Sequence, residues 1–110
     1  MIGEQLRIAL LLVSGVLFLN PRAMVAQDAA ASYKAKCAMC HGTDGKGDTP
    51  AGKKMGARDF ASAEVQKQTD TDLTQILAKG KNKMPAYESK LKPDEIKDLV
   101  AYIRQLGKSH

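Results

Sequence analysis

The stretch KCAMCHG, residues 36–42, holds both cysteines of this 110-residue chain and one of its two histidines. The residues leading into it, Ala29 to Cys40, contain no proline and predict a helix. Spacings of three and four residues place Cys37, Cys40 and His41 on one face of such a helix. Two thiols and an imidazole on one face indicate a metal site, a disulfide or a covalently held group.

Four uses of this motif compete. A zinc site needs about four ligands, and outside the motif only His110 or a carboxylate is left. A thioredoxin-like redox pair expects a preceding strand, but no segment alternates as a strand does, and a structural disulfide gives His41 no role. Covalent haem attachment uses all three side chains, because C-x-x-C-H is its signature. We therefore predict one haem c, bound through thioethers from Cys37 and Cys40.

The N-terminus reads as an export signal. Residues 8–19 are almost continuously apolar, yet twelve residues are too few for a bilayer core, which needs about 20 in a helix. A basic start, a short apolar run and small residues beyond it are typical of a secretory signal. We expect a signal peptide at 1–26, cleaved after Ala26 or alternatively after Ala31, and a single domain at 27–110. An uncleaved anchor is the alternative, and the lack of a nearby cysteine argues against a lipid anchor.

The expected mature chain is basic and has few large apolar side chains. Its aromatic residues are Tyr33, Phe60, Tyr87 and Tyr102. A core this thin needs a staple, which a large apolar haem supplies. Removing residues 1–26 leaves 15 basic and 11 acidic residues, a formal net charge of +4. This charge favours acidic partners or anionic surfaces and does not determine the fold.

Periodicity predicts an all-α domain of three or four helices joined by two loops rich in glycine and lysine. The clearest helix is 92–106, where Pro93 takes the first helical position, apolar residues form one stripe and Gly107 follows as the stop. The other expected elements are a helix at 29–40 capped by Asp28, a loop at 42–56, a helical turn within 60–68, a helix at 71–79 capped by Thr69 or Asp70 and stopped by Gly80, and a second loop at 80–90.

These motifs resemble the small class I c-type cytochromes. CAMCH matches the attachment motif of that family, and KNKMPAY, residues 81–87, resembles its second-ligand loop. EIKDLVAYIRQL, residues 95–106, is similar to its C-terminal helix, and Tyr33 stands where the family packs an aromatic side chain against that helix. The resemblance runs from Tyr33 to Leu106 and implies a small cytochrome c fold wrapped around one haem.

The resemblance also implies the iron ligands. His41 corresponds to the proximal ligand and Met84 to the distal one. Met39 and Met55 are the rivals, but Met39 is tethered to the proximal side and Met55 lies in a loop where methionine is a common gap filler. The family places a proline about nine residues after the histidine, where its carbonyl accepts the free ring N–H and orients the imidazole. Pro50 has that offset, and an ordinary loop proline is the alternative.

The remaining aromatic side chains have expected roles as well. We expect Tyr33 and Tyr102 to pack in the core between the N- and C-terminal helices. Tyr87 follows Met84 closely and is a candidate for contact with the haem or a propionate, which the sequence leaves open.

An iron with two protein ligands has no open position for a substrate, so the resemblance implies a one-electron carrier and not a catalyst. We expect a soluble, monomeric, periplasmic protein that serves larger redox proteins and binds no nucleic acid. Several lysines are expected to rim the haem edge and guide docking onto acidic patches, with a generally solvated surface as the alternative. They are Lys36, Lys46, Lys53, Lys54, Lys79, Lys81 and Lys83.

Two other classes of function stay open at this point. One is a haem enzyme or a gas or redox sensor, in which Met84 leaves the distal position free. The other is a metal-binding domain without haem.

Overall fold

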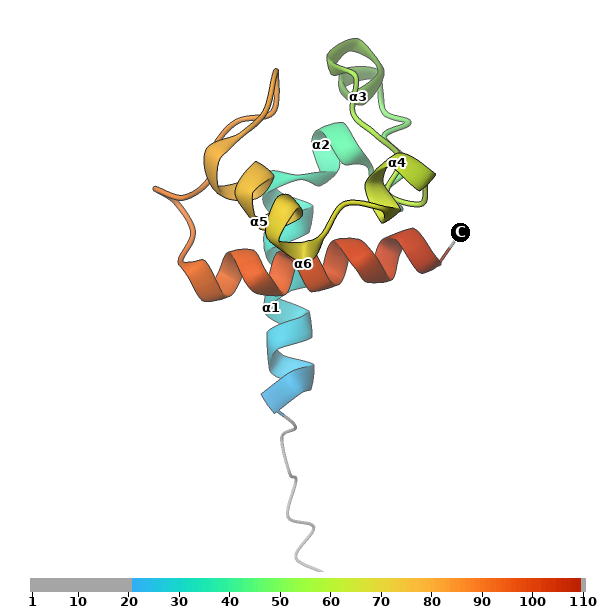
Figure 1. Cartoon of the computed structure of the whole chain (residues 1–110). Coiled ribbons are helices and arrows are strands. Elements are labelled where there is room, and N and C mark those ends of the chain that lie inside the picture. Colours follow the sequence, from blue (N-terminus) through green and yellow to red (C-terminus); the bar gives the residue numbers. More distant parts are fainter. Residues whose placement is uncertain (1–20, 110) are drawn as a thin grey trace, which may run out of the picture.

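A computed structural model describes residues 21–109 of the chain, and these residues form helices and no strand (Figure 1). An isolated antiparallel bridge joins Lys81 to Met84. The helices are α1 (Pro21–Lys36), α2 (Ala38–His41), α3 (Pro50–Met55), α4 (Ala63–Gln66), α5 (Asp70–Lys79) and α6 (Pro93–Lys108). The all-α class is confirmed. The described residues hold six helices where three or four were expected, because α2, α3 and α4 are only four to six residues long.

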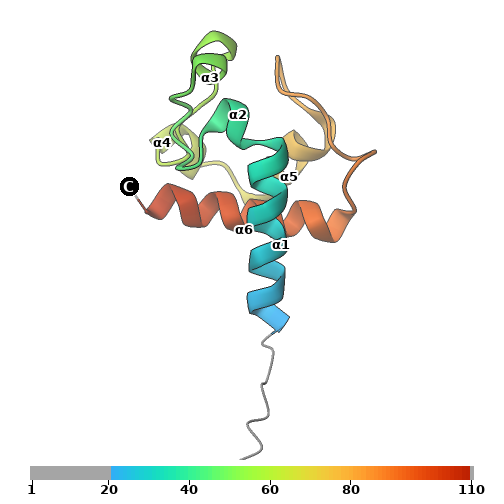
Figure 2. The same cartoon turned by 180° about the vertical axis from the view of Figure 1, so that it is seen from behind.

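The core lies where α1 crosses α6 (Figures 1 and 2). Tyr33 and Leu99 are its most completely buried side chains, each 1% exposed. Tyr33 packs against Tyr102, with ring centroids 5.2 Å apart, and against Phe60 at 6.2 Å. The expected core role of Tyr33 and Tyr102 is therefore confirmed. The apolar stripe of α6 is buried as predicted through Ile96, Leu99, Val100 and Ile103.

The N-terminal helix begins earlier than the sequence indicates. Because α1 starts at Pro21, a residue well suited to the first helical turn, Asp28 lies inside the helix and does not cap it. The apolar run at 8–19 falls outside the described residues. In the part of the chain that the structure covers, none of the helices is long and apolar enough to cross a membrane.

Two other boundaries differ from prediction. The expected loop at 42–56 contains α3, because Thr49 caps it by accepting a hydrogen bond from the Gly52 N–H at 2.9 Å and Pro50 opens it. Helix α6 continues through Gly107, which is buried: a Cβ there would lie 2.8 Å from the Phe60 carbonyl oxygen. Gly107 is thus a close-packing site and not a helix stop.

The remaining helix signals hold. Thr69 caps α5 and forms a capping box with Asp72, with both hydrogen bonds at 3.0 Å. Gly80 follows the last residue of α5, as predicted. Arg104 of α6 donates to the Asp70 carboxylate at 2.9 Å and to the Gln68 carbonyl, so α6 holds the start of α5 in place.

The structure separates the two candidate cleavage positions. Met24 to Asp28 are exposed, and Ala29, which follows them, is a core residue that is 6% exposed. Cleavage after Ala26 keeps Ala29, whereas cleavage after Ala31 removes it from the crossing with α6. We expect the mature protein to start at Gln27, which intact-mass measurement and N-terminal sequencing of the exported protein check. A start at Ser32, or a chain that keeps residues 1–26, would contradict this expectation.

Candidate haem site

The CAMCH segment is a helical turn set off from α1 by a break at Cys37. The Cys37 N–H still donates to the Tyr33 carbonyl at 2.8 Å, but φ of −117° at Cys37 ends α1. The His41 and Cys40 N–H groups then donate to the Cys37 carbonyl at 2.9 and 3.2 Å. The turn keeps both thiols and the imidazole within one short segment, but the helix expected at 29–40 is interrupted at Cys37.

The two cysteines are free thiols and are not joined by a disulfide. Cys37 is buried and Cys40 is partly exposed. Burial raises the pKa of the Cys37 thiol to about 11, while the Lys36 charge acts in the opposite direction. The thiol of Cys37 is therefore protonated at neutral pH. On addition across a vinyl group such a thiol would supply the sulfur to one carbon and the hydrogen to the other.

The imidazole of His41 is held in an apolar environment. It stacks on the Phe60 ring with centroids 4.8 Å apart and an interplanar angle of 27°. Burial lowers the pKa of His41. The main-chain carbonyl of Arg58 has a smaller effect in the opposite direction. Nδ1 is buried and has no hydrogen-bond partner among the described residues. A neutral, half-buried imidazole suits metal ligation. Its Nδ1, which has no partner, is free either to bind a metal or to donate to an outer acceptor while the other nitrogen binds the metal.

Thr49 braces the attachment turn from the following loop. Its Oγ1 lies 2.7 Å from the Met39 carbonyl oxygen and 3.0 Å from that of Cys40, and it also accepts the Gly52 N–H. Pro50, the expected acceptor for His41, is exposed at the start of α3. Since Nδ1 has no partner here, the role of Pro50 stays a prediction.

Met84 lies in a tight two-residue turn. The Lys81 N–H donates to the Met84 carbonyl at 3.1 Å and the Met84 N–H donates back at 2.9 Å, with Asn82 at φ 53° in the turn. The Met84 side chain is partly buried and packs against the core. Its rivals face solvent, with Met39 79% exposed and Met55 49% exposed. Of these three methionines, only Met84 is held by both its main chain and its side chain.

Three residues near the site were assigned no site role from the sequence. Tyr33 donates its hydroxyl to the Gly42 carbonyl at 2.6 Å, directly after His41. Phe60 supports the His41 ring and Thr49 braces the turn. The Thr49-Pro50 pair is recognisable in the sequence as a helix cap. Nothing in the sequence around Thr49 or Phe60 indicates that these side chains contact the CAMCH turn.

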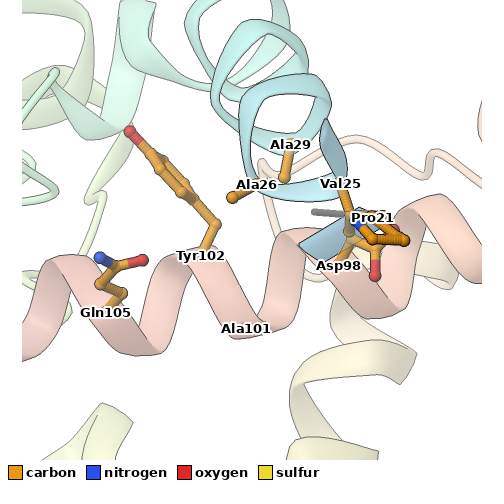
Figure 3. A pocket seen from close by; sticks show the side chains of 8 residues that line it. All are labelled: Pro21, Val25, Ala26, Ala29, Asp98, Ala101, Tyr102 and Gln105. Atoms are coloured by element: carbon orange, nitrogen blue, oxygen red, sulfur yellow. The ribbon is translucent and has the colours of Figure 1, made fainter. Parts of the chain in front are cut away.

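A separate apolar groove lies between α1 and α6 (Figure 3). Its volume is about 330 Å³, and it is lined by Pro21, Val25, Ala26, Ala29, Asp98, Ala101, Tyr102 and Gln105. None of the motif residues contributes to it. Cleavage after Ala26, which the sequence predicts, would remove three of its lining residues.

Comparisons with known proteins agree with this geometry. Residues 25–103 match the family model described as "Cytochrome C oxidase, cbb3-type, subunit III". The chain is 36% identical over 80 residues to a cytochrome c6 from Nostoc sp., covering 70% of this chain and 65% of that protein. It is 36% identical over 73 residues to the cbb3-type cytochrome c oxidase subunit FixPc of Rhizobium leguminosarum, covering 64% of this chain and 24% of the subunit. It thus spans under two thirds of the length of each.

A solved structure is also similar. The KustC0563 c-type cytochrome superimposes with a TM-score of 0.67 at 37% identity, covering 72% of this chain and 96% of that one. The chain therefore belongs to the c-type cytochrome family.

Members of this family carry covalently bound haem c. The residues present fit that group. Cys37 and Cys40 are unpaired thiols in one turn, and His41 beside them has a buried nitrogen without a partner. Cys37, Cys40 and His41 would hold it from the α1–α2 side. The loop between α5 and α6, which contains Met84, lies on the same side of α6 (Figure 1).

Gly80 controls where the Met84 turn lies. It has φ 78°, and a Cβ there would lie 2.6 Å from the Met84 carbonyl oxygen. Gly56 has a similar φ of 72°, but a Cβ there meets nothing within 4 Å. We expect Gly56→Ala to cost about 1–2 kcal/mol of unfolding free energy from backbone strain alone. Gly80→Ala should cost more, because the turn must also move.

Guanidinium unfolding of the two haem-loaded variants measures the difference. Equal or smaller destabilisation by Gly80→Ala would show that the Met84 turn does not depend on this contact.

Proposed function

We propose that this chain is a mono-haem electron carrier whose iron is bound by His41 on one side and Met84 on the other. The observation that carries the proposal is the C-x-x-C-H turn with free thiols and a half-buried imidazole whose Nδ1 has no partner among the described residues, in a chain of the c-type cytochrome family. The similarity to a cytochrome c6 supports electron transport as the function.

The bound haem supplies a one-electron ferric/ferrous couple, and the protein residues set its environment. His41 is held by the Phe60 ring and by the turn that Tyr33 and Thr49 fix, so it stays in place when the iron charge changes. Met84 offers a thioether, which favours ferrous iron when it binds opposite imidazole. Two protein ligands leave no position for a substrate, and we infer that the protein is not an enzyme.

Replacing Met84 tests the ligand set. In oxidised wild-type protein we expect the weak far-red absorption band of sulfur-to-ferric-iron charge transfer, and we expect Met84→Ala to lose it. Ferrous Met84→Ala should also bind carbon monoxide rapidly, since the distal position becomes open. Met55→Ala is the matched control and should keep the band.

A haem-loaded wild type without the band, or with fast carbon monoxide binding, would favour the enzyme or sensor alternative. Loss of the band in Met55→Ala instead would make Met55 the ligand. Absence of covalent haem after expression with a working attachment system would favour a haem-free metal-binding domain.

We further propose that the protein acts in the periplasm after removal of residues 1–26, as a soluble monomer serving redox proteins. The basic start and apolar run at the N-terminus support export. The burial of Ala29 after the exposed stretch Met24 to Asp28 supports cleavage before Ala29.

We propose that lysines rim the haem edge. Lys81 and Lys83 lie in the Met84 turn, Lys36 directly precedes Cys37, and all three are exposed. Among the seven lysines named from the sequence, only Lys53 and Lys79 form ion pairs in the described structure, with Asp48 at 3.2 Å and Glu88 at 2.8 Å. The others are free to attract an anionic partner, which supports docking onto acidic patches.

Small inorganic redox reagents test this surface without a known partner. Oxidation of the ferrous protein by anionic hexacyanoferrate(III) should slow as ionic strength rises, because salt screens the attraction. The double change Lys81→Gln and Lys83→Gln should slow this oxidation at low salt, whereas Lys97→Gln, at an exposed position of α6, should not. Salt-independent rates, or equal effects of both changes, would leave a generally solvated basic surface as the better description.

A further inference from the structure

Tyr87 connects the Met84 loop to the cysteine-bearing end of α1. Its hydroxyl donates to the Lys36 carbonyl at 3.1 Å, across 51 residues of sequence. Within the described residues, this is the sole side-chain hydrogen bond that joins the loop after α5 to the segment that ends in His41. It therefore links the two sides of the proposed haem site.

The acceptor explains why this contact forms. Lys36 is the last residue of α1, and the last four carbonyls of a helix have no partner within the helix. After the break at Cys37, the Cys40 and His41 N–H groups donate to the Cys37 carbonyl and not to that of Lys36. The Tyr87 hydroxyl supplies a partner for this solvent-exposed carbonyl at the end of α1.

The main chain of Tyr87 is anchored separately. Its N–H donates to the Leu77 carbonyl at 3.0 Å, and the next N–H, of Glu88, donates to Ala78 at 3.2 Å. These acceptors are again end carbonyls, here of α5. Lys90 Nζ lies 5.9 Å from the Tyr87 ring centre and adds a cation–π contact. Tyr87 is thus fixed to α5 by its backbone and to α1 by its side chain.

Met84 lies three residues before Tyr87, and Pro85 between them restricts the chain further. The Met84 turn projects beyond α5 on the side of α6 that also carries α2 and α3 (Figures 1 and 2). Its own bridge to Lys81 is internal to the loop, so it fixes the shape of the turn and not its distance from His41. The Tyr87 hydroxyl, in contrast, restrains the distance between this loop and the segment that contains His41.

We propose that Tyr87 is a positioning residue for Met84: its hydroxyl bond to the Lys36 carbonyl holds the methionine loop against the haem-attachment side. This inference rests on the proposed ligation by Met84. Removing one neutral hydrogen bond changes an equilibrium by a factor of about five. The population with Met84 detached from iron should rise by about that factor in Tyr87→Phe.

The haem-loaded protein is compared as wild type, Tyr87→Phe and Tyr102→Phe. Tyr102 is the matched control, because its ring packs on Tyr33 and its hydroxyl makes no hydrogen bond with any described residue. Two guanidinium midpoints are measured for each protein, one for loss of the far-red band and one for loss of helical circular dichroism. Carbon monoxide combination with the ferrous form gives an independent rate.

Tyr87→Phe should keep the band in buffer and lose it at a lower guanidinium concentration than either other protein, with carbon monoxide binding about fivefold faster. The helical midpoint should stay near that of Tyr102→Phe. Adding Tyr87→Phe to Met84→Ala should leave the carbon monoxide rate unchanged, since no ligand remains to position.

Other outcomes overturn the inference. If Tyr87→Phe behaves as Tyr102→Phe does, or shifts both midpoints equally, Tyr87 is a general structural residue. If it speeds carbon monoxide binding further in the Met84→Ala background, it acts elsewhere. A wild type that lacks the far-red band overturns Met84 ligation itself, and with it this role, so failure of the ligand set is distinguishable from failure of Tyr87.

Discussion

The position of Tyr33 at the crossing of α1 and α6 is the constraint from which the haem site is built. Its ring is almost fully buried against Tyr102 and Phe60, and its hydroxyl donates to the Gly42 carbonyl at 2.6 Å. Burial raises the pKa of this hydroxyl, which therefore stays protonated and keeps donating at physiological pH. One side chain thus joins the helix crossing to the residue after His41. The orientation of the attachment turn follows from the packing of the core.

Phe60 extends this constraint to the imidazole. It contacts Tyr33 on one side and stacks on His41 on the other, so the core reaches the candidate ligand through two aromatic contacts. Thr49 acts on the same turn through main-chain carbonyls. The segment around Cys37 and His41 is therefore fixed by the packing of aromatic rings from the core and by hydrogen bonds from the following loop.

The sequence predicted those features that are encoded locally. C-x-x-C-H is a motif of five residues, the apolar stripe of α6 is a periodic pattern, and the Thr69 cap is recognised within four residues. The structure contains the predicted helices and the Thr69 cap. Contacts across long separations left no such trace. Tyr87 meets Lys36 across 51 residues, and Phe60 meets His41 across the glycine-rich loop.

Errors at the helix ends had a similar cause. A glycine that stops a helix and one that lets a helix pack closely look the same in one sequence, which is why Gly107 was misassigned. An aspartate near a helix start suggests a cap only if the helix starts there. Because α1 begins at Pro21, seven residues earlier, Asp28 lies inside the helix, where no free main-chain N–H group is left to donate a hydrogen bond to its carboxylate.

The two sides of the proposed site are held by different kinds of constraint. The His41 side is tied to the core by rings and by hydrogen bonds within a single turn, and its cysteines are placed for covalent bonds to haem. The Met84 side is a loop that keeps its own shape through the Lys81 bridge but meets the opposite side through few side chains. Local opening should therefore begin at the Met84 loop, because loops with few buried contacts open at the lowest free energy. Under the proposed ligation by Met84, such an arrangement would let the protein keep its haem when Met84 leaves the iron, since haem retention and ligation would depend on separate parts of the chain.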